Sequence, residues 1–202
     1  MLGVPFAVVQ TPLLMESRAL GRSDLVVSRL SLGSWRTFER IPRDTGAAVL
    51  RAARDAGITF LDDARYNDES GTAPLATGWS EVVFGRLFRA VGWPRDEVVV
   101  ANKLWWEFWP SESAAAEVDG SLRRMGFEFI DLAYSAPLPD GLPVEDGVAA
   151  MGALVAAGKL RAWARSTGRP PPSPMRWPPP TTRGCRHRAP PSSPTTWCIA
   201  AP

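Results

Sequence analysis

Two kinds of apolar pattern alternate along the central part of the chain. Short runs rich in Val, Ile, Leu and Phe are typical of buried strands, and they lie at 25–33, 58–61, 96–103, 129–134 and 159–163. Longer segments between them repeat apolar residues at helical spacing, at about 44–56, 80–91, 113–125 and 144–157. This alternation of strand and helix predicts an α/β protein with a parallel sheet and right-handed crossovers.

Local signals indicate where several of these elements begin and end. Asp44 and Ser80 are predicted to cap two helices, because short polar side chains accept hydrogen bonds from the first free backbone amides. Gly57, Gly126 and Gly158 each follow a predicted helix, where glycine readily adopts the left-handed conformation that ends it. The predicted helices therefore have defined ends, and each leads directly into the next strand.

Charged side chains follow the second and third predicted strands at the points where those strands end. Asp62 and Asp63 come directly after the run Ile58–Leu61, Tyr66 follows them, and Lys103 ends the third strand. The carboxyl ends of parallel strands are where α/β proteins place their chemistry. No glycine-rich phosphate loop follows the first strand, which counts against a Rossmann or P-loop fold. These features predict about half of a (β/α)₈ barrel.

Composition narrows the chemistry that this barrel could perform. Cysteine and histidine occur only near the C-terminus, at Cys185, His187 and Cys198. Residues 1–184 therefore hold no thiol and no imidazole, which excludes cysteine or histidine catalysis and a zinc site there. Without a disulfide framework, a cytoplasmic location is expected. Residues 1–15 lack a basic start and contain prolines, so they are interpreted as an N-terminal extension, and no apolar run reaches the length of a transmembrane helix.

Six stretches of the chain carry a family resemblance. They are L-G-R-S-D-L-V-V-S-R-L-S-L-G-S-W at 20–35, A-G-I-T-F-L-D-D-A-R-Y at 56–66, S-E-V-V-F-G-R-L-F at 80–88, V-V-V-A-N-K at 98–103, S-L-R-R-M-G-F-E-F-I-D-L at 121–132 and L-V-A-A-G-K-L-R-A-W at 154–163. Together, in this order, they resemble the aldo-keto reductases. The resemblance implies a (β/α)₈ TIM barrel, NADPH as the cofactor, and reversible reduction of aldehydes or ketones to alcohols.

The resemblance also implies roles for individual residues. Tyr66 is the implied catalytic acid, which protonates the carbonyl oxygen while hydride adds to the carbon. The ammonium of Lys103 is expected to favour the tyrosinate and so lower the pKa of Tyr66, and Asp62 is expected to hold Lys103. Asp63 remains an alternative to Asp62, because the family's spacing between aspartate and tyrosine is one residue longer than Asp62–Tyr66.

The same resemblance implies where cofactor and substrate bind. The implied cofactor-binding residues are Gly33, Ser34, Trp35 and Asp62. The aromatic residues that could wall an apolar pocket for a small carbonyl compound are Trp35, Trp105, Trp106 and Trp109. No metal ion is expected.

One departure from the family weakens the implied activity. The family carries a catalytic histidine after the fourth strand, and here that region has Ser135 followed by Ala136 at the corresponding position. The alternative is a catalytically inactive reductase-like fragment or an NADPH-binding pseudoenzyme. Without the resemblance, Asp62 and Asp63 could equally be turn-capping carboxylates, and Lys103 a solvated strand end.

The end of the chain has a different character from the rest. Residues 164–202 are rich in Pro and Arg, with no acidic residue and no apolar periodicity, so they are interpreted as a disordered tail after a partial barrel at 16–163. Regrouping of codons suggests that one base was lost near Ala164, which would place the residues after about Trp163 out of frame. A half barrel leaves sheet edges open, so an impaired, aggregation-prone product is expected. The scattered arginines are weak evidence for a polyproline ligand or a nucleic-acid arm, and no nucleic-acid or membrane partner is expected.

Overall fold

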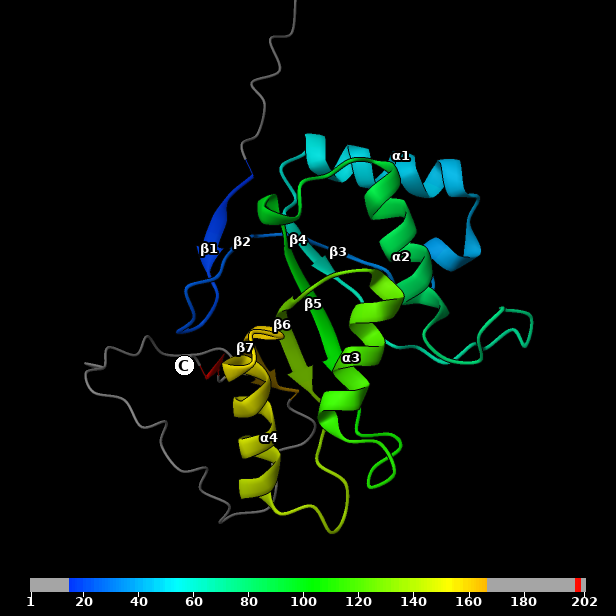
Figure 1. Cartoon of the computed structure of the whole chain (residues 1–202). Coiled ribbons are helices and arrows are strands. Elements are labelled where there is room, and N and C mark those ends of the chain that lie inside the picture. The colour runs from blue at the N-terminus through cyan, green and yellow to red at the C-terminus, as the bar shows by residue number, and fades with distance from the viewer. Residues whose placement is uncertain (1–14, 167–198, 201–202) are drawn as a thin grey trace, which may run out of the picture.

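The computed structural model describes residues 15–166 and 199–200, and it shows a central sheet with helices packed along it (Figure 1). The strands are β1 (Ser17–Ala19), β2 (Val26–Ser28), β3 (Ser31–Gly33), β4 (Phe60–Asp62), β5 (Val99–Leu104), β6 (Ile130–Ser135), β7 (Leu160–Arg165) and β8 (Ile199–Ala200). The helices are α1 (Arg43–Asp55), α2 (Trp79–Ala90), α3 (Ala114–Met125) and α4 (Val144–Ala156), with 3₁₀ turns η1 (Phe38–Arg40) and η2 (Arg95–Glu97).

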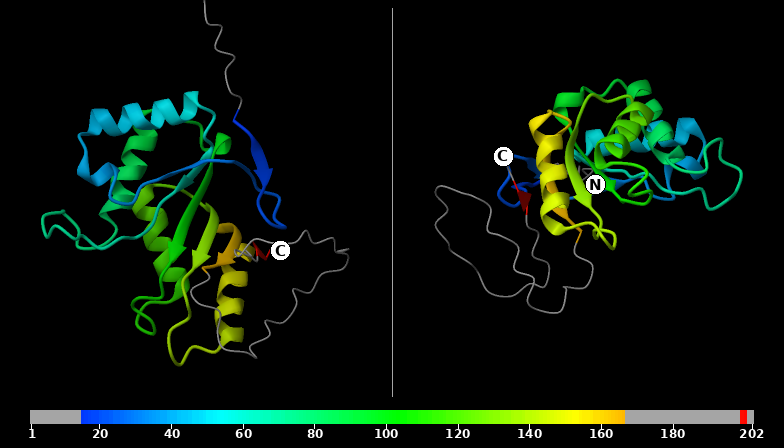
Figure 2. Two further views of the ribbon diagram at one scale, coloured as in Figure 1. Left: turned by 180° about the vertical axis from the view of Figure 1, so that it is seen from behind. Right: turned by 60° about the horizontal axis from the view of Figure 1, so that its bottom comes forward.

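The larger sheet has the strand order β3-β4-β5-β6-β7-β8. Strands β3 to β7 are parallel neighbours, and β8 pairs with β7 in the antiparallel direction. A helix follows each of the first four parallel strands, so every connection crosses over to the next strand in the row (Figure 2). This confirms the predicted α/β class, since these are successive units of the repeat from which a (β/α)₈ barrel is built.

Side chains alternate along each strand, so the sheet has two faces with separate apolar clusters. On the outer face, Leu61, Val100 and Leu104 pack with residues of the helices and form the outer-face cluster. On the inner face, which corresponds to the interior of a barrel, the side chains form a second cluster with the β1–β2 hairpin. This inner-face cluster consists of Leu25, Val27, Val99, Ala101, Leu132, Ala162 and Ala164.

The predicted strand at 25–33 is in fact two strands. β2 pairs with β1 as an antiparallel hairpin, whereas β3 joins the parallel sheet. Between them the Ser28 hydroxyl donates to the Leu30 carbonyl and accepts from the backbone amides of Thr59 and Phe60. The apolar pattern concealed this break because both halves contribute side chains to apolar clusters.

The structure also corrects two predicted helix caps. α1 has no side-chain cap, and Asp44 lies inside its first turn. α2 begins after Gly78, whose φ of 78° is left-handed, and the hydroxyl of Ser80 donates instead to the Ala64 carbonyl at 2.7 Å. By contrast, Ser113 does cap α3, accepting from the amide of Ala116. Ser80 therefore ties α2 to the loop after β4 rather than to its own first turn.

The remaining predicted elements are confirmed with small shifts at their ends. The fifth parallel strand, β7, continues to Arg165, beyond the predicted boundary of the partial barrel at 163. Most of the predicted extension at 1–15 and of the predicted tail at 164–202 lies outside the described residues, and so does nearly all the sequence on which the frame-change hypothesis depends.

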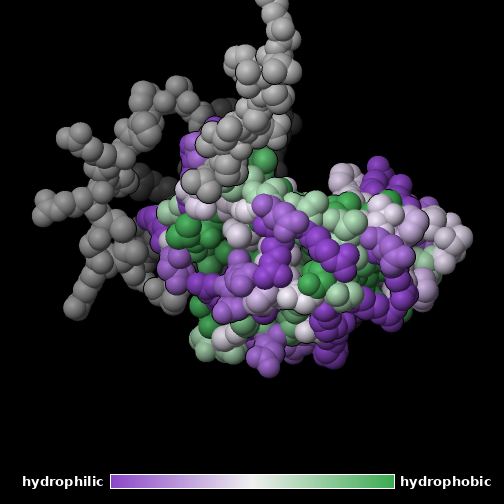
Figure 3. Space-filling view, turned by 90° about the horizontal axis from the view of Figure 1, so that it is seen from above, coloured by the Kyte–Doolittle hydropathy of each residue, from purple (hydrophilic) through white to green (hydrophobic). Residues whose placement is uncertain are grey.

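The surface on the side of α1 is largely hydrophilic, with smaller apolar areas between the polar ones (Figure 3). Exposed residues of α1, among them Arg43 and Arg51, contribute to it. Among residues 15–166 and 199–200, no helix has the length and apolar character needed to cross a membrane.

Candidate active site

Lys103 joins the ends of two neighbouring strands. It continues the inner face of β5 beyond Ala101, and its ammonium donates to both carboxylate oxygens of Asp62, at the end of β4, at 2.9 Å each. A third bond reaches the main-chain carbonyl of Asp63 at 3.2 Å. Burial has the largest single influence and works to lower the pKa of Lys103, but the charge and hydrogen bonds of Asp62, with Tyr66, raise the pKa overall. Lys103 is therefore an ammonium ion at neutral pH.

Tyr66 lies on the loop after β4, with its ring beside this ammonium. The Lys103 Nζ atom is 5.7 Å from the centroid of the Tyr66 ring. Trp35, after β3, stacks on the same ring with centroids 5.9 Å apart, and Trp105, after β5, is tilted against it at 6.3 Å. The ends of three neighbouring strands thus bring a phenol, a cation and two indole rings together. Such a group can donate a proton to a small molecule held against the indoles.

The pKa of Tyr66 is raised, which corrects the expectation that Lys103 would lower it below its usual value. Burial of the phenol is the largest cause. The charge and hydrogen bond of Lys103 do act in the expected direction, but burial, together with the negative charges of Asp62 and Asp63, outweighs them. Tyr66 is therefore protonated throughout the neutral range, as a proton donor must be.

The Asp63 side chain lies buried beside Ser34, and Lys103 bonds only to its main-chain carbonyl. Its side chain is fully buried and accepts a hydrogen bond from the hydroxyl of Ser34, while its Oδ2 atom has no hydrogen-bond partner. Burial, and then the negative charge of Glu81, raise the pKa of Asp63 to about 8. The carboxylate that contacts Lys103 is therefore that of Asp62, while Asp63 contributes only its main-chain carbonyl.

The predicted cofactor-binding residues divide into two groups. Gly33 is exposed, pairs in register with Asp62, and has no atom within 4 Å of the place where a Cβ would lie. Trp35 is 55% exposed, although Tyr66 stacks on its ring and the Arg36 guanidinium lies over it at 4.7 Å from the ring centroid. Ser34, in contrast, is buried with its hydroxyl bound to Asp63. Gly33 and Trp35 are therefore exposed, Asp62 is partly exposed with both oxygens bound to Lys103, and the Ser34 side chain is inaccessible.

A cavity of about 220 Å³ opens beside Tyr66. It lies between the segment 35–40 and the loop 66–74. Arg36 and Arg40 both bind Glu69, at 2.8 Å from Arg36 Nε and 2.7 Å from Arg40 Nη2 to Oε2. These ion pairs tie the loop to the segment after β3, so they define one wall of the cavity.

Two of the four predicted pocket tryptophans lie elsewhere. Trp106 is buried, and its indole Nε1 donates to the Ser135 hydroxyl at 3.0 Å. Trp109 packs against the outer-face cluster, close to Gly141. Neither makes a ring contact with Tyr66 among the described residues, whereas Trp35 and Trp105 both do.

The segment after β6 offers no side-chain donor near Tyr66 in place of histidine. Ala136 packs against the outer-face cluster, and the Ser135 hydroxyl donates to the Ala136 carbonyl at 3.1 Å besides accepting from Trp106. Tyr134, which the sequence argument did not select, lies opposite Lys103 in register with its ring 5.9 Å from Nζ. Burial, and then the charge of Asp62, raise its pKa to about 12. Tyr134 is two residues after Leu132 in β6, so the alternation of side chains along a strand could have placed Tyr134 on the inner face from the sequence alone.

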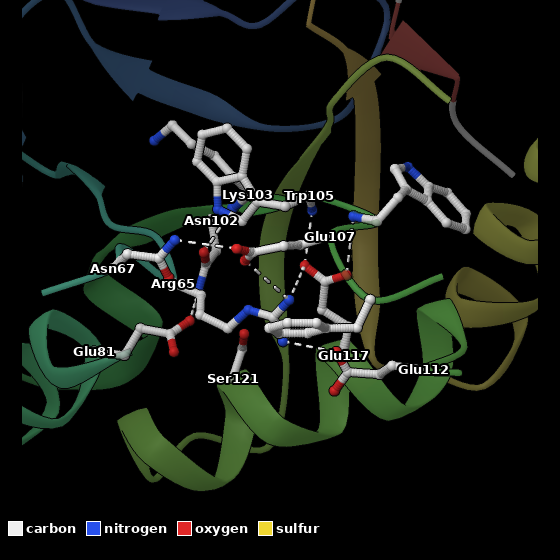
Figure 4. Close-up of polar contacts among 12 residues, drawn as sticks. Arg65, Asn67, Glu81, Asn102, Lys103, Trp105, Glu107, Glu112, Glu117 and Ser121 are labelled. Atoms are coloured by element: carbon white, nitrogen blue, oxygen red, sulfur yellow. Dashed lines mark hydrogen bonds and ion pairs between the residues drawn. The ribbon is translucent and has the colours of Figure 1, made fainter. Parts of the chain in front are cut away.

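A second group that the sequence argument missed surrounds Arg65, the residue before Tyr66. Its buried guanidinium lies among the carboxylates of Glu107, Glu112 and Glu117, which come from the loop after β5 and from α3 (Figure 4). No local sequence signal connects these residues, because Glu112 is 47 positions away along the chain. Within the described part of the chain, no cluster of His, Cys, Asp and Glu side chains is arranged to hold a metal ion.

Comparison with known proteins supplies independent information about this site. A sequence model described as "Aldo/keto reductase family" matches residues 29–170, which include β3 to β7 and the strand ends just described. The chain is 34% identical over 160 residues to a probable voltage-gated potassium channel subunit beta from Oryza sativa subsp. japonica, covering 75% of this chain and 46% of that protein. It is also 34% identical over 156 residues to an L-glyceraldehyde 3-phosphate reductase from Escherichia coli (strain K12), covering 72% and 43%. The chain thus spans about half the length of these curated relatives.

Proposed function

Because the chain belongs to the aldo/keto reductase family, we propose that its function is the NADPH-dependent reduction of an aldehyde or ketone to an alcohol. The observation that carries this proposal is the contact of Lys103 with both oxygens of Asp62 beside the ring of Tyr66. A partly buried ion pair next to a phenol suits acid–base chemistry on a small molecule. The three side chains come from the end of β4, from β5 and from the loop after β4.

In this proposal Tyr66 donates the proton to the carbonyl oxygen. Its raised pKa keeps the hydroxyl protonated before the reaction. The Lys103 ammonium stabilises the negative charge that the phenol oxygen acquires as the proton leaves. Asp62 fixes the ammonium through its two hydrogen bonds, so no reorganisation is needed at that moment.

The residues present fit a nicotinamide cofactor at the end of β3, and the family generally uses NAD(P)H. When bound, such a cofactor supplies the hydride for reduction. The open space at Gly33 and the exposed part of Trp35 suit a planar ring, and Asp62 is the adjacent polar group. Ser34 does not take part through its hydroxyl, which is bound to Asp63. We assign cofactor contacts to Gly33, Trp35 and Asp62.

The substrate is a small carbonyl compound held beside Tyr66. Trp35 and Tyr66 line the cavity of about 220 Å³, and Trp105 packs against the Tyr66 ring without lining that cavity. Trp106 and Trp109 do not line this cavity, since the first binds Ser135 and the second packs on the outer-face cluster.

A second candidate function is cofactor binding without turnover. The observation that favours it is Ala136, which stands where the family resemblance places a histidine. The neighbouring Ser135 hydroxyl is already bound to Trp106 and to the Ala136 carbonyl, so it does not replace that histidine as a donor. In this case Tyr66 and Lys103 would line a binding site only.

The test combines NADPH fluorescence titration with turnover of a panel of small aldehydes and ketones, using the full chain. We expect Tyr66→Phe to bind NADPH as the unchanged chain does and to lose turnover by about 10²- to 10⁴-fold, the usual contribution of a positioned acid. Tyr134→Phe distinguishes the donors, because the ring of Tyr134 is also near Lys103.

The outcomes separate the two functions. Turnover that persists in Tyr66→Phe but is lost in Tyr134→Phe would contradict the assignment of the donor. NADPH binding with no turnover of any carbonyl compound supports the second candidate. No binding at all contradicts both.

A further inference from the structure

Arg65 is a buried cation that directly precedes the proposed proton donor. Only 3% of its side chain is exposed. Its Nη1 atom donates to Glu112 at 2.8 Å, and its Nη2 atom lies 3.4 Å from Glu117 and 3.9 Å from Glu107. The ring of Phe108 covers the guanidinium, with its centroid 5.0 Å from Cζ. A charge buried this deeply persists only with partners, so these contacts fix where Arg65 lies.

Glu117 connects this cation to the loop that carries Trp105. It lies in the first turn of α3 and is 3% exposed, and its two carboxylate oxygens accept from the backbone amides of Trp105 at 2.7 Å and Trp106 at 3.1 Å. Trp106 has a φ of 61°, a left-handed conformation that a bulky residue adopts only where other contacts enforce it. Glu117 therefore holds the turn after β5 through both backbone amides.

One half of this network ends at Tyr66 and the other at a residue whose ring contacts Tyr66. Arg65 leads to Tyr66 through a single peptide bond, and Glu117 leads to Trp105 through a hydrogen bond to its amide. Trp105 is in turn the residue whose indole tilts against the Tyr66 ring. Figure 4 shows Arg65 and Glu117 facing each other beneath Lys103 and Trp105, between the loop after β4 and α3.

We propose that Arg65 and Glu117 are a pair of positioning residues, which together hold Tyr66 and Trp105 in the arrangement needed for proton transfer to a bound carbonyl. Neither residue touches the substrate cavity, so the pair acts through Tyr66 and Trp105. The expected effect on turnover rests on the proposed function, whereas the expected effect on the position of the Tyr66 ring does not.

The need for such a pair follows from where the two residues lie. Tyr66 and Trp105 are both on loops beyond strand ends, where the sheet's own hydrogen bonds no longer fix the chain. A displacement of a reacting group by about 1 Å can reduce a rate by about 10²-fold. A planar guanidinium among several carboxylates resists rotation and restricts both loops at once.

The test compares Glu117→Gln with a matched control, Asp131→Asn. Both native residues are buried carboxylates that accept a backbone amide and bind arginine, but Asp131 is near the start of β6, at the far end of the sheet, where it contacts Val100, Arg95 and Arg161. We expect Glu117→Gln to lower kcat by about 10- to 100-fold with little change in KM, and Asp131→Asn to lower Tm without this change in kcat. Glu112→Gln, which alters a more exposed partner of Arg65, should give a smaller change in the same direction.

A second readout does not depend on turnover. Tyr66 and Tyr134 are the two tyrosines of the chain, so carbon-13 labelling of tyrosine in a Tyr134→Phe background reports on the Tyr66 ring alone. We expect Glu117→Gln to shift the Tyr66 ring signals, since the ring current of Trp105 moves, and Asp131→Asn to leave them in place.

The results separate failure of this proposal from failure of the proposed function. If the unchanged chain reduces no carbonyl compound, the proposed function fails, and the positioning role is judged by the ring signals. If Glu117→Gln and Asp131→Asn both leave those signals unchanged, the pair is a purely structural ion pair and the proposal is overturned. If Glu117→Gln does not fold, Glu112→Gln provides the same readout, and unchanged ring signals in it overturn the proposal equally.

Discussion

Asp63 and Glu81 are two buried acidic residues placed directly behind the strand end that carries Asp62. Asp63 is fully buried, with the Ser34 hydroxyl as its hydrogen-bond donor. Glu81 accepts from the Asn102 amide and pairs with Arg124. Glu81 therefore has an amide and a cation as partners. The Oδ2 atom of Asp63 has no hydrogen-bond partner, so the protonated form of Asp63 is favoured.

The raised pKa of Asp63 predicts that stability falls as pH rises. Its pKa moves from 3.8 to about 8 in the folded chain, so between these values the folded chain holds a proton that the unfolded chain has released. The stabilisation is complete below the unfolded pKa and is lost as pH rises through about 8. Between about pH 5 and about pH 9 the free energy of unfolding should fall by up to about 4 kcal/mol from this group. Asp63→Asn should remove most of that fall in urea unfolding series.

Asp68→Asn is the matched control for this measurement. Asp68 is a partly exposed carboxylate whose pKa is lowered to about 2, chiefly by a hydrogen bond from the Ala73 amide, so it does not titrate in the same pH range. This variant should keep the full pH dependence. An Asp63→Asn variant with the same decline as the unchanged chain would show that Asp63 is ionised in the folded state.

At the scale of elements, α2 and α3 approach each other closely at Gly85. A Cβ atom added there would lie 2.0 Å from the main-chain carbonyl oxygen of Met125, the last residue of α3. The contact also brings together the rings of Phe84, Phe88 and Phe127. This packing sets the distance between the two helices that carry Glu81 and Glu117.

Gly85→Ala should therefore destabilise the chain, although alanine is the better helix former. The added methyl group cannot fit against a backbone carbonyl without separating the helices, and overpacking of this kind costs about 1–3 kcal/mol. Urea unfolding measures the loss. Gly152→Ala in α4 is the control, because nothing lies within 4 Å of its added Cβ, and it should gain about 0.5–1 kcal/mol. Equal stabilisation by both substitutions would disprove the close approach.

The apolar pattern predicted the elements better than it predicted their connections. Continuous runs located β5 and β6, because a strand buried on both faces needs apolar residues at every position. The sequence predicts that the Ser80 hydroxyl caps α2, whereas in the structure it donates to the Ala64 carbonyl on the loop after β4. The ion pairs of Arg65 were not visible for the same reason: each joins segments far apart in the sequence, and single-residue propensities carry no information about such contacts.

The sequence predicts which residues form the candidate site better than it predicts their pKa values. The strand-end positions of Asp62, Lys103 and Tyr66 follow from the sequence pattern, and the structure brings these residues together. The predicted direction of the Tyr66 pKa shift is wrong. Burial of the phenol is the largest cause of the shift, and the sequence gives no measure of that burial. The roles of these residues in catalysis remain predictions.

On the scale of the whole molecule, the β1–β2 hairpin covers part of the inner face of the sheet. Leu25 and Val27 pack on the inner-face cluster with residues of β5, β6 and β7. Asp24 adds an ion pair to Arg161 of β7 at 3.5 Å. Five parallel strands present an apolar inner face, and the hairpin withdraws part of that face from water.

Leu25→Ala should destabilise the chain by about 2–5 kcal/mol, because Leu25 is 1% exposed and its removal leaves a cavity against the sheet. Val26→Thr is the control: Val26 is 59% exposed on the same hairpin, and the change should stay within about 0.5 kcal/mol. Urea unfolding at neutral pH measures both. Two equally mild effects would mean that the hairpin does not pack on the sheet.

The contacts of Lys103 have a consequence for its chemical reactivity. Asp62 and Tyr66 raise the pKa of Lys103 against the effect of burial, and the Asp63 carbonyl also accepts from it, so the side chain stays an ammonium with no lone pair to attack an electrophile. The other lysine of the chain, Lys159, is a more exposed residue in an ion pair with Asp119. An amine-directed acylating reagent should therefore modify Lys159 first, and labelling of Lys103 would report directly on release of the contact with Asp62.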